Sequence, residues 1–233
     1  MRQTEDSFYH SSVYQEFKGI EQSEFRNIVR FFESRTDEIV HLEFNEYFEL
    51  LLTYAEALFE IGTYHSFLAV ADQAIAIIIE QNIKYYHGED VFFNILFKKA
   101  AAHFNLMEYD KAKHILQELI KMDSGNELTI RFLKKCSRQE KPSYLKSTRA
   151  ISVFLFLLTA GIIAFELCLI RPFFSAHIDL IELVRNVVFG SGWIILIAGD
   201  LFFRWRVNTQ VNEFVSSVKK KKKNPVRETT SLL

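Results

Sequence analysis

Two acidic residues interrupt otherwise apolar stretches of this sequence. Glu166 stands in the segment Gly161–Phe174, which reads GIIAFELCLIRPFF, and Asp200 stands near the end of a second apolar run. A carboxylate inside a membrane-spanning helix is costly unless it pairs with a positive charge or faces a water-filled cavity. Two roles are therefore open for Glu166: it stabilises a helical hairpin, or it takes part in conduction or gating.

Two arginines are candidate partners of Glu166. Arg171 follows five residues later in the sequence, which is about 7.5 Å along a helix axis. An antiparallel second helix would bring Arg185 to a similar depth, whereas Asp200 would lie at the opposite end, one turn before Arg204. We expect Glu166 to pair with Arg171 or Arg185 and to stabilise the hairpin; gating is the alternative.

No other arrangement of reactive residues forms a catalytic or metal-binding motif. The sequence contains no GxxxxGK[ST], GxGxxG, HExxH or GxSxG motif, and Cys136 and Cys168 are too few for a zinc site. The loop Asn82–Asp90, NIKYYHGED, could in principle bind a divalent ion, but its last two acids are equally typical of a helix start, which we favour. The sequence thus predicts no enzymatic activity, no metal site and no cofactor.

The acidic residues lie in elements that are long enough to cross a membrane. A spanning helix needs about 20 apolar residues, with roughly 17 to 25 tolerated, and residues 150–170 and 186–203 satisfy this length. A buried helix of a soluble core is the alternative, but such helices are seldom apolar on every face. Trp193 and Trp205 lie near the two ends of the second run, as interfacial anchors do. We therefore predict a transmembrane hairpin over residues 150–203.

Charge is distributed unevenly although the net charge is only −1. Residues 1–133 contain 12 Lys and Arg against 22 Asp and Glu, whereas residues 134–149 contain 6 against 1 and residues 204–233 contain 8 against 2. Basic segments that flank membrane spans usually stay in the cytoplasm. Because the first residues also lack the apolar core of a secretory signal, we expect a two-pass integral membrane protein with both termini cytoplasmic.

A run of lysines lies close to the second span. Its members are Lys219, Lys220, Lys221, Lys222 and Lys223. Attraction to anionic lipid, nucleic-acid binding and a topological signal are three possible roles. Because Arg204–Val218 connects the run directly to the span, contact with anionic lipids of the inner leaflet is favoured, at about 1 kcal/mol per basic residue. The acidic first part of the chain should repel nucleic acid.

Apolar residues recur at helical spacing through residues 21–140. The expected helices span residues 21–35, 42–61, 64–81, 90–106, 109–122 and 126–139, and no segment alternates as a half-buried strand does. Residues 24–33 and 127–136 would cover the two ends of this helical domain. Residues 1–20 form a separate N-terminal segment, residues 141–149 a basic linker, and residues 204–233 a basic tail.

The helical domain contains an internal repeat. Tyr54–Ile77 can be laid over Lys99–Met122 at an offset of 45 residues, so that each unit is a helix, a tight turn that ends in Tyr, and a second helix. The second unit, Leu96–Ser124, resembles a tetratricopeptide repeat (TPR), and the first does so more weakly. The residues at the matching packing positions are Ala57, Gly62, Tyr64, Leu96, Ala100, Ala102, Tyr109 and Ala112. Met107 departs from the pattern, which has glycine at this turn.

This resemblance implies an all-α protein in which a short α-solenoid precedes two transmembrane helices. Solenoids of this kind offer a concave groove for a peptide or a partner helix. A series of acids should favour basic or mixed ligands, unless it is only a solvated helix face: Glu43, Glu46, Glu49, Glu56 and Glu60. The sequence favours a non-enzymatic membrane-anchored adaptor; the alternative is an effector that oligomerises through the hairpin and permeabilises the membrane. Gly190 and Gly192 lack GxxxG spacing, so they support a homo-oligomer only weakly.

Overall fold

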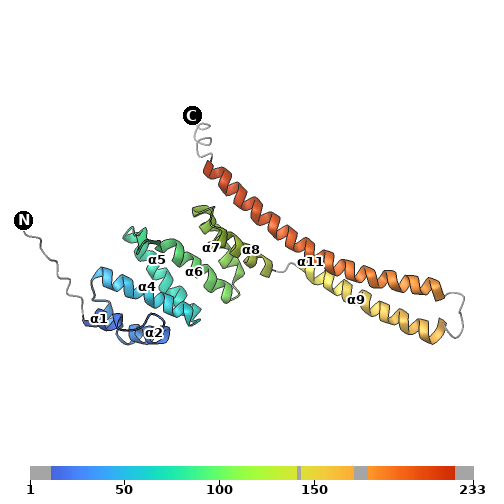
Figure 1. Cartoon of the computed structure of the whole chain (residues 1–233), viewed down its shortest axis with the longest axis horizontal. Helices are drawn as coiled ribbons and strands as arrows, with labels where there is room; N and C mark the ends of the chain where they lie inside the picture. The colour runs from blue at the N-terminus through green and yellow to red at the C-terminus, as the bar shows by residue number, and fades with distance from the viewer. Residues whose placement is uncertain (1–11, 141–142, 171–177, 224–233) are drawn as a thin grey trace, which may run out of the picture. The chain divides into compact units, whose positions relative to one another are not determined.

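The computed structural model describes residues 12–140, 143–170 and 178–223, and these are almost entirely helical (Figure 1). This confirms the predicted all-α class. The chain divides into two compact units between Gly125 and Asn126. The division lies nearer the N-terminus than the predicted domain end at residue 140, so the last predicted helix of the repeat domain belongs to the second unit.

The first unit is a sequential stack of helices. Its helices are α1 (Ser12–Lys18), α2 (Phe25–Ser34), α3 (Thr36–Ile39), α4 (Phe44–Glu60), α5 (Tyr64–Glu80), α6 (Val91–Asn105) and α7 (Tyr109–Met122). In chain order, α2 packs against α4, α4 against α5, α5 against α6, and α6 against α7. Figure 1 shows α4, α5 and α6 side by side in this order. Each helix therefore buries its apolar face mainly against its neighbours in sequence.

Large apolar side chains fill the interior of this stack. Phe48 and Phe67 are each 1% exposed, and Leu50 and Leu58 of α4 are buried beside them in the same cluster. Alanines replace large residues where helix backbones approach closely, as Ala71 of α5 does at 0% exposure. The alternation of large and small side chains is the pattern that close helix packing requires.

Three features of the first unit were not predicted: α1, α3 and a short β-hairpin. α1 lies within the segment that the sequence analysis treated as separate, and it buries Val13, Tyr14 and Phe17 in the core. Strands β1 (Tyr85–Tyr86) and β2 (Glu89–Asp90) form a short antiparallel hairpin before α6. His87 and Gly88 at its tip have φ of 49° and 83°, and two successive residues with positive φ are typical of the tightest hairpin turn.

The second unit contains α8 (Glu127–Gln139), α9 (Ser143–Phe165), a π-helical turn (Glu166–Ile170) and α11 (Ile178–Lys223). α9 and α11 pack together as two antiparallel helices, and α8 contacts α11 (Figure 1). α11 is 46 residues long, so most of the predicted basic tail continues the helix of the second span. Near the junction, Phe203 and Val207 of α11 pack against Leu145 of α9.

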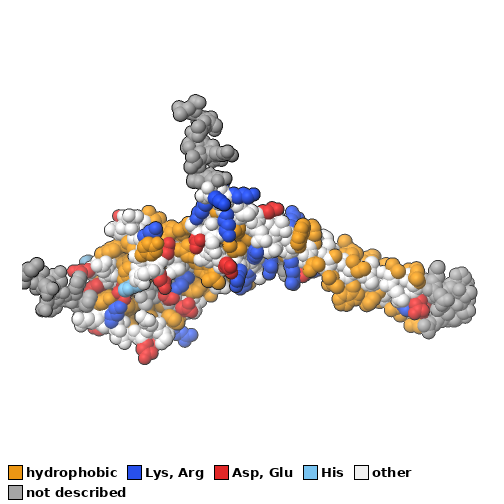
Figure 2. Space-filling model, turned by 45° about the horizontal axis from the view of Figure 1, so that its top comes forward, with side chains coloured by type: hydrophobic (Ala, Val, Ile, Leu, Met, Phe, Trp, Pro, Cys, Tyr) orange, Lys and Arg blue, Asp and Glu red, His pale blue; other side chains and the backbone are white. Residues whose placement is uncertain are grey.

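Two helices are long and apolar enough to cross a membrane, over Leu145–Cys168 and within Glu182–Lys223. In their most apolar windows only 17% and 11% of the residues are buried inside the structure. Figure 2 shows hydrophobic side chains over the hairpin of α9 and α11, whereas Lys and Arg side chains gather toward the other end of α11. A core helix of a soluble protein would be mostly buried, so this exposure favours a lipid environment.

Candidate functional site

The two helical hairpins of the first unit have the same turn. α4 ends at Glu60 and α5 begins at Tyr64, while α6 ends at Asn105 and α7 begins at Tyr109, each 45 residues later. In both turns the second residue after the helix has positive φ: 81° at Gly62 and 61° at Met107. The N–H of Gly62 donates to the carbonyl of Phe59 at 3.1 Å, and the N–H of Met107 donates to that of Phe104 at 3.0 Å.

The tyrosine after each turn packs against the preceding helix in the same way. Phe59 and Tyr64 have ring centroids 5.7 Å apart at an interplanar angle of 67°, and Phe104 and Tyr109 are 5.4 Å apart at 65°. The small residues predicted at the helix contacts, Ala57, Ala100, Ala102 and Ala112, are all 0% exposed, while Leu96 is half-buried. The structure therefore places the four alanines in the interior, and Tyr64 and Tyr109 each against the aromatic residue five positions earlier.

A groove of about 440 Å³ lies on the face formed by α1, α4, the β-hairpin and α6. Apolar side chains form part of its lining, including Phe67, Val91 and Ile95. Charged side chains of both signs surround them: Lys18, Glu49, Glu56, His87, Glu89 and Lys98. An apolar floor with a mixed-charge border suits a peptide or a partner helix that carries both apolar and charged residues.

One end of the groove contains a polar cluster that joins α1 to α4. The Tyr14 hydroxyl donates to Glu49 Oε2 at 2.7 Å, and the Lys18 ammonium pairs with the other carboxylate oxygen. Burial alone would raise the pKa of Glu49, but the hydrogen bonds from Lys18 and Tyr14 outweigh it and lower the pKa of this carboxyl. The hydrogen bond with Glu49 raises the pKa of Lys18, and burial together with Glu49 raises that of Tyr14. At neutral pH the Glu49 carboxylate and the Lys18 ammonium are therefore charged, and the Tyr14 hydroxyl keeps its proton.

The acidic face expected on α4 is only partly present. Glu46 is 7% exposed and so belongs to the interior. Glu49 contacts Tyr14 and Lys18, and Glu56 pairs with Lys98 of α6 at 2.5 Å. Glu43 and Glu60 are exposed, as predicted. The charged lining of the groove consequently has both signs, three carboxylates against two lysines, which favours mixed rather than strongly basic ligands.

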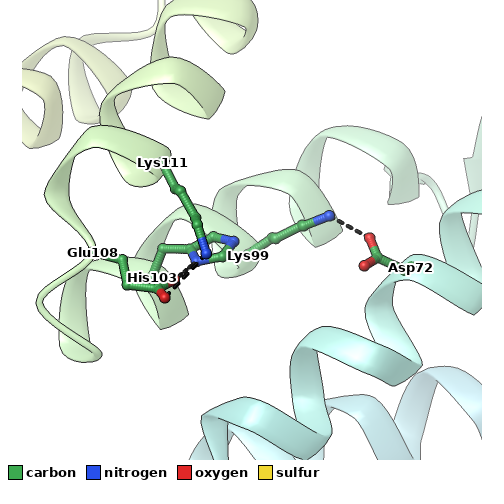
Figure 3. A network of polar contacts seen from close by, with 5 residues as sticks. All are labelled: Asp72, Lys99, His103, Glu108 and Lys111. Carbon is green, nitrogen blue, oxygen red and sulfur yellow. Dashed lines mark hydrogen bonds and ion pairs between the residues drawn. The ribbon is translucent and has the colours of Figure 1, made fainter.

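A second network connects α6 to both of its neighbours (Figure 3). Lys99 pairs with Asp72 of α5, and His103 Nδ1 lies 2.6 Å from Glu108 Oε2 at the start of α7. Lys111 donates to the other oxygen of Glu108 at 3.0 Å. The hydrogen bond with His103, supported by Lys111, lowers the pKa of the Glu108 carboxyl. Because all these groups pair with one another across helix contacts, the network has a structural role.

In the second unit, Arg185 is the partner of Glu166. Its Nη1 donates to Glu166 Oε2 at 2.8 Å, and Nη2 donates to Glu182 Oε1 at 3.1 Å. Glu166 is 2% exposed, and its helix turns π-helical at this residue. The other predicted partner, Arg171, lies outside the described residues. The structure therefore contains one of the two ion pairs that the sequence analysis proposed.

Polar and small residues recur every seven positions along the contact between α9 and α11. On α9 they are the buried Ser152, Thr159 and Glu166; on α11 they are Arg185, Gly192 and Gly199. A side chain at Gly192 would meet the ring of Phe156 at 2.9 Å, and one at Gly199 would meet Thr148 Oγ1 at 3.1 Å.

The hydroxyls of this seam are satisfied within their own helix. Ser152 donates to the carbonyl of Thr148 at 3.0 Å and Thr159 to that of Leu155 at 2.8 Å. A seven-residue repeat of small residues is typical of closely packed transmembrane helices. Sequence reasoning missed this seam, although its spacing is visible, because Gly190 and Gly192 were considered as a pair; Gly190 faces open space.

Asp200 lies at the other end of the hairpin contact. Its Oδ2 accepts from Arg204 Nε at 3.0 Å, and its Oδ1 lies 3.8 Å from Arg149 Nη2 of α9. The predicted lysine run is exposed over the last turn of α11.

Asp90 caps α6, since its side chain accepts from the N–H of Phe93 at 2.9 Å. This supports the helix-start interpretation of the Asn82–Asp90 loop.

Comparisons of this chain with protein-family models, curated proteins and solved structures found no match. The functional argument therefore depends on the groove of the first unit and on the hairpin of the second.

Proposed function

We propose that this protein is a non-enzymatic adaptor that binds a protein segment in the groove of its first unit and is anchored in a membrane by the hairpin of α9 and α11. The groove of about 440 Å³ is the observation that carries the proposal. Its apolar floor supplies contact area, and its paired charges are already oriented by helix contacts. Little ordering would be needed on binding, which favours affinity.

The TPR-like identity of the first unit is part of this proposal. It is supported by the identical turn geometry, by the four fully buried alanines and by the sequential packing of the helices. Ala112 follows the common pattern of a small residue where the two helices touch, whereas Phe67 occupies the equivalent place in the first hairpin at 1% exposure. Repeats of this class present a concave surface that binds peptides.

The proposed topology places both termini in the cytoplasm. Arg149 directly precedes the first apolar run, and Arg204 and Arg206 directly follow the second. Basic residues at these positions oppose translocation. The first unit and the lysine run would then share the cytoplasmic side, where the lysines could contact anionic lipid.

Photo-crosslinking on the full chain in native membranes tests the groove. A photoreactive residue at position 94, on the groove side of α6, should give a discrete protein adduct, whereas one at position 114 of α7 should not. Lys98→Glu should abolish the adduct at position 94 because it reverses a charge on the groove border. Lys111→Glu, an equal charge change at an exposed site outside the groove lining, is the matched control. The same adduct from both positions would contradict the proposal.

A membrane-permeabilising effector is the second candidate. The polar seam favours it, because a hairpin with Ser152, Thr159 and Glu166 on one face could direct that face to a wet lumen in an oligomer. The pair of Glu166 with Arg185 favours the anchoring role instead, since it satisfies the acid within one hairpin. Dye leakage from vesicles that contain the full chain, lost on Glu166→Gln while the hairpin stays folded and assembled, would favour the effector.

A further inference from the structure

A second cavity lies on the hairpin, at the end opposite Glu166. It encloses about 680 Å³ and is lined by Arg149 and Val153 of α9 and by Leu196, Ile197, Asp200, Leu201 and Arg204 of α11. Apolar area dominates the lining, and all three charged groups lie at one end of the apolar runs. This open groove thus has a cationic mouth at one end and an apolar lining beyond it.

The two arginines are arranged around a single carboxylate. Asp200 offers one oxygen to Arg204 Nε at 3.0 Å and the other to Arg149 Nη2 at 3.8 Å. The Asp200 side chain is 42% exposed, and those of Arg149 and Arg204 are 54% and 66% exposed. Two guanidinium groups and one carboxylate leave one positive charge, and guanidinium N–H groups on both arginines remain available to an anion.

The apolar part of the lining continues from this mouth toward the loop end of the hairpin. Val153 is one turn from Arg149 on α9, and Ile197 is two turns from Arg204 on α11, about 6 and 10 Å along the helix axes. Val153 and Ile197 are each 55% exposed. An acyl chain that lies along the hairpin, with its phosphate at the arginines, would contact both of these side chains.

We propose that this cavity is a binding site for one anionic glycerophospholipid of the inner leaflet. Its phosphodiester lies between Arg149 and Arg204, and one acyl chain packs against Val153, Leu196 and Ile197. The inference depends on the proposed membrane anchoring. Charge complementarity favours this ligand, because the single net positive charge of the site matches the single negative charge of a phosphodiester. Basic pockets between membrane helices also recognise anionic head groups on the cytoplasmic side.

Native mass spectrometry of the full chain, released from micelles with phosphatidylglycerol or phosphatidylcholine, tests the site. The wild-type chain should retain one phosphatidylglycerol in preference to phosphatidylcholine. Arg149→Gln and Arg204→Gln should each reduce this retention by about fivefold. Arg206→Gln, an equal charge loss two residues away and outside the lining, should change it less than about twofold.

Asp200→Asn gives the opposite expectation. It removes the carboxylate that competes with the lipid phosphate, so retention should rise by about fivefold. Inorganic phosphate should not displace the lipid, because it lacks the acyl chain. Equal losses from Arg204→Gln and Arg206→Gln, or equal retention of the two lipids, would overturn the site.

Carbonate extraction of membranes separates this inference from the proposal on which it depends. If the wild-type chain is extracted, the hairpin does not anchor it, and both proposals fail. If the chain stays embedded but shows no lipid preference, only the lipid site fails.

Discussion

Among the described residues of the second unit, Glu166 is the most deeply buried charged group at 2% exposure, and Arg185, at 22% side-chain exposure, contacts it from the facing helix. An acid in this position is tolerated because its partner is on the facing helix. The pair thus specifies which residues of α9 and α11 lie opposite each other. Loss of either partner breaks this ion pair in a region of low polarity.

We expect Glu166→Gln and Arg185→Gln each to destabilise the hairpin by about 2 to 4 kcal/mol. The exchange of both residues, Glu166→Arg with Arg185→Glu, should restore part of this loss, because the charges match again across the helices although the new carboxylate at position 185 repels Glu182. Unfolding of the full chain in mixed micelles, followed by tryptophan fluorescence, measures the effect. Glu182→Gln is the matched control: its side chain is 54% exposed, and its loss should cost less than about 0.5 kcal/mol.

The two equivalent turns make a second prediction at the residue scale. Met107 has φ of 61° and is 75% exposed, so it bears backbone strain without any buried contact to compensate. Met107→Gly should therefore stabilise the first unit by about 0.5 to 1 kcal/mol. This is the net effect, because glycine also raises the conformational entropy of the unfolded chain, which opposes folding. Gly62→Ala, at φ of 81° in the first turn, should destabilise it by about 1 kcal/mol.

Pulse proteolysis of the full chain in urea reports both changes. An equal effect of the same sign from the two substitutions would contradict the equivalence of the turns, whatever its size.

At the scale of elements, hydrophobic spacing was sufficient for the central helices. Residues 42–61 and 64–81 were predicted as helices, and α4 and α5 span Phe44–Glu60 and Tyr64–Glu80. It was not sufficient for α1, which has only seven residues, or for the β-hairpin, which depends on the backbone at His87 and Gly88. The extension of α11 was missed because its basic residues suggested a tail, although Phe203, Val207, Val211 and Val215 recur at helical spacing and are buried. The burial of Glu46 depends on neighbouring helices, which a one-dimensional pattern does not contain.

The contact between α1 and α4 should depend on pH through the Glu49 cluster. Since the pKa of Glu49 is lowered in the folded state, its contribution is complete above the ordinary value of 4.5 and is lost as pH falls through the lowered pKa. The raised pKa of Lys18 has the opposite sign, so its contribution is complete below 10.5 and is lost as pH rises through the raised pKa. The docking of α1 should therefore be constant at neutral pH.

Hydrogen exchange of the α1 amides in the full chain, corrected for the intrinsic rate at each pH, measures how the docking of α1 weakens as pH falls. Protection should fall below pH 4.5 in the wild type, and Glu49→Gln should give low protection at every pH. A wild-type profile unchanged into strong acid would show that the apolar contacts of Val13 and Phe17 alone dock the helix.

The close approach of α9 and α11 depends on Gly192. A Cβ there would lie 2.9 Å from the ring of Phe156, so Gly192→Leu should force the helices apart and destabilise the hairpin by about 1 to 3 kcal/mol. Gly190→Leu adds the same side chain two residues earlier, where nothing lies within 4 Å, and should be nearly neutral. Thermal unfolding of both variants in micelles makes the comparison. Equal destabilisation would mean that glycine at both sites serves another purpose, such as contact with a second copy.

At the scale of the whole molecule, the distribution of basic residues along α11 separates two contributions to membrane topology. Arg204 and Arg206 directly follow the apolar run, whereas Lys219 begins 15 residues after Arg204, about 22 Å further along a helix. Topology depends most on basic residues close to the ends of the spans. The arginines at the ends of the apolar runs should therefore set the orientation, while the lysine run should add affinity for anionic lipid only.

Replacement of Lys219–Lys223 by Gln should leave the orientation unchanged, because Arg149, Arg204 and Arg206 remain at the ends of the apolar runs. Replacement of these three arginines and Lys146 by Gln should give a mixed population, since the remaining basic residues lie further from the apolar runs. Protease digestion of intact cells and of inverted vesicles, probed with an antibody to the first unit, gives the fraction in each orientation. Mixed orientation after loss of the lysines alone would show that the run is itself the topological signal. Its distance from the span would then no longer support a separate role in lipid contact.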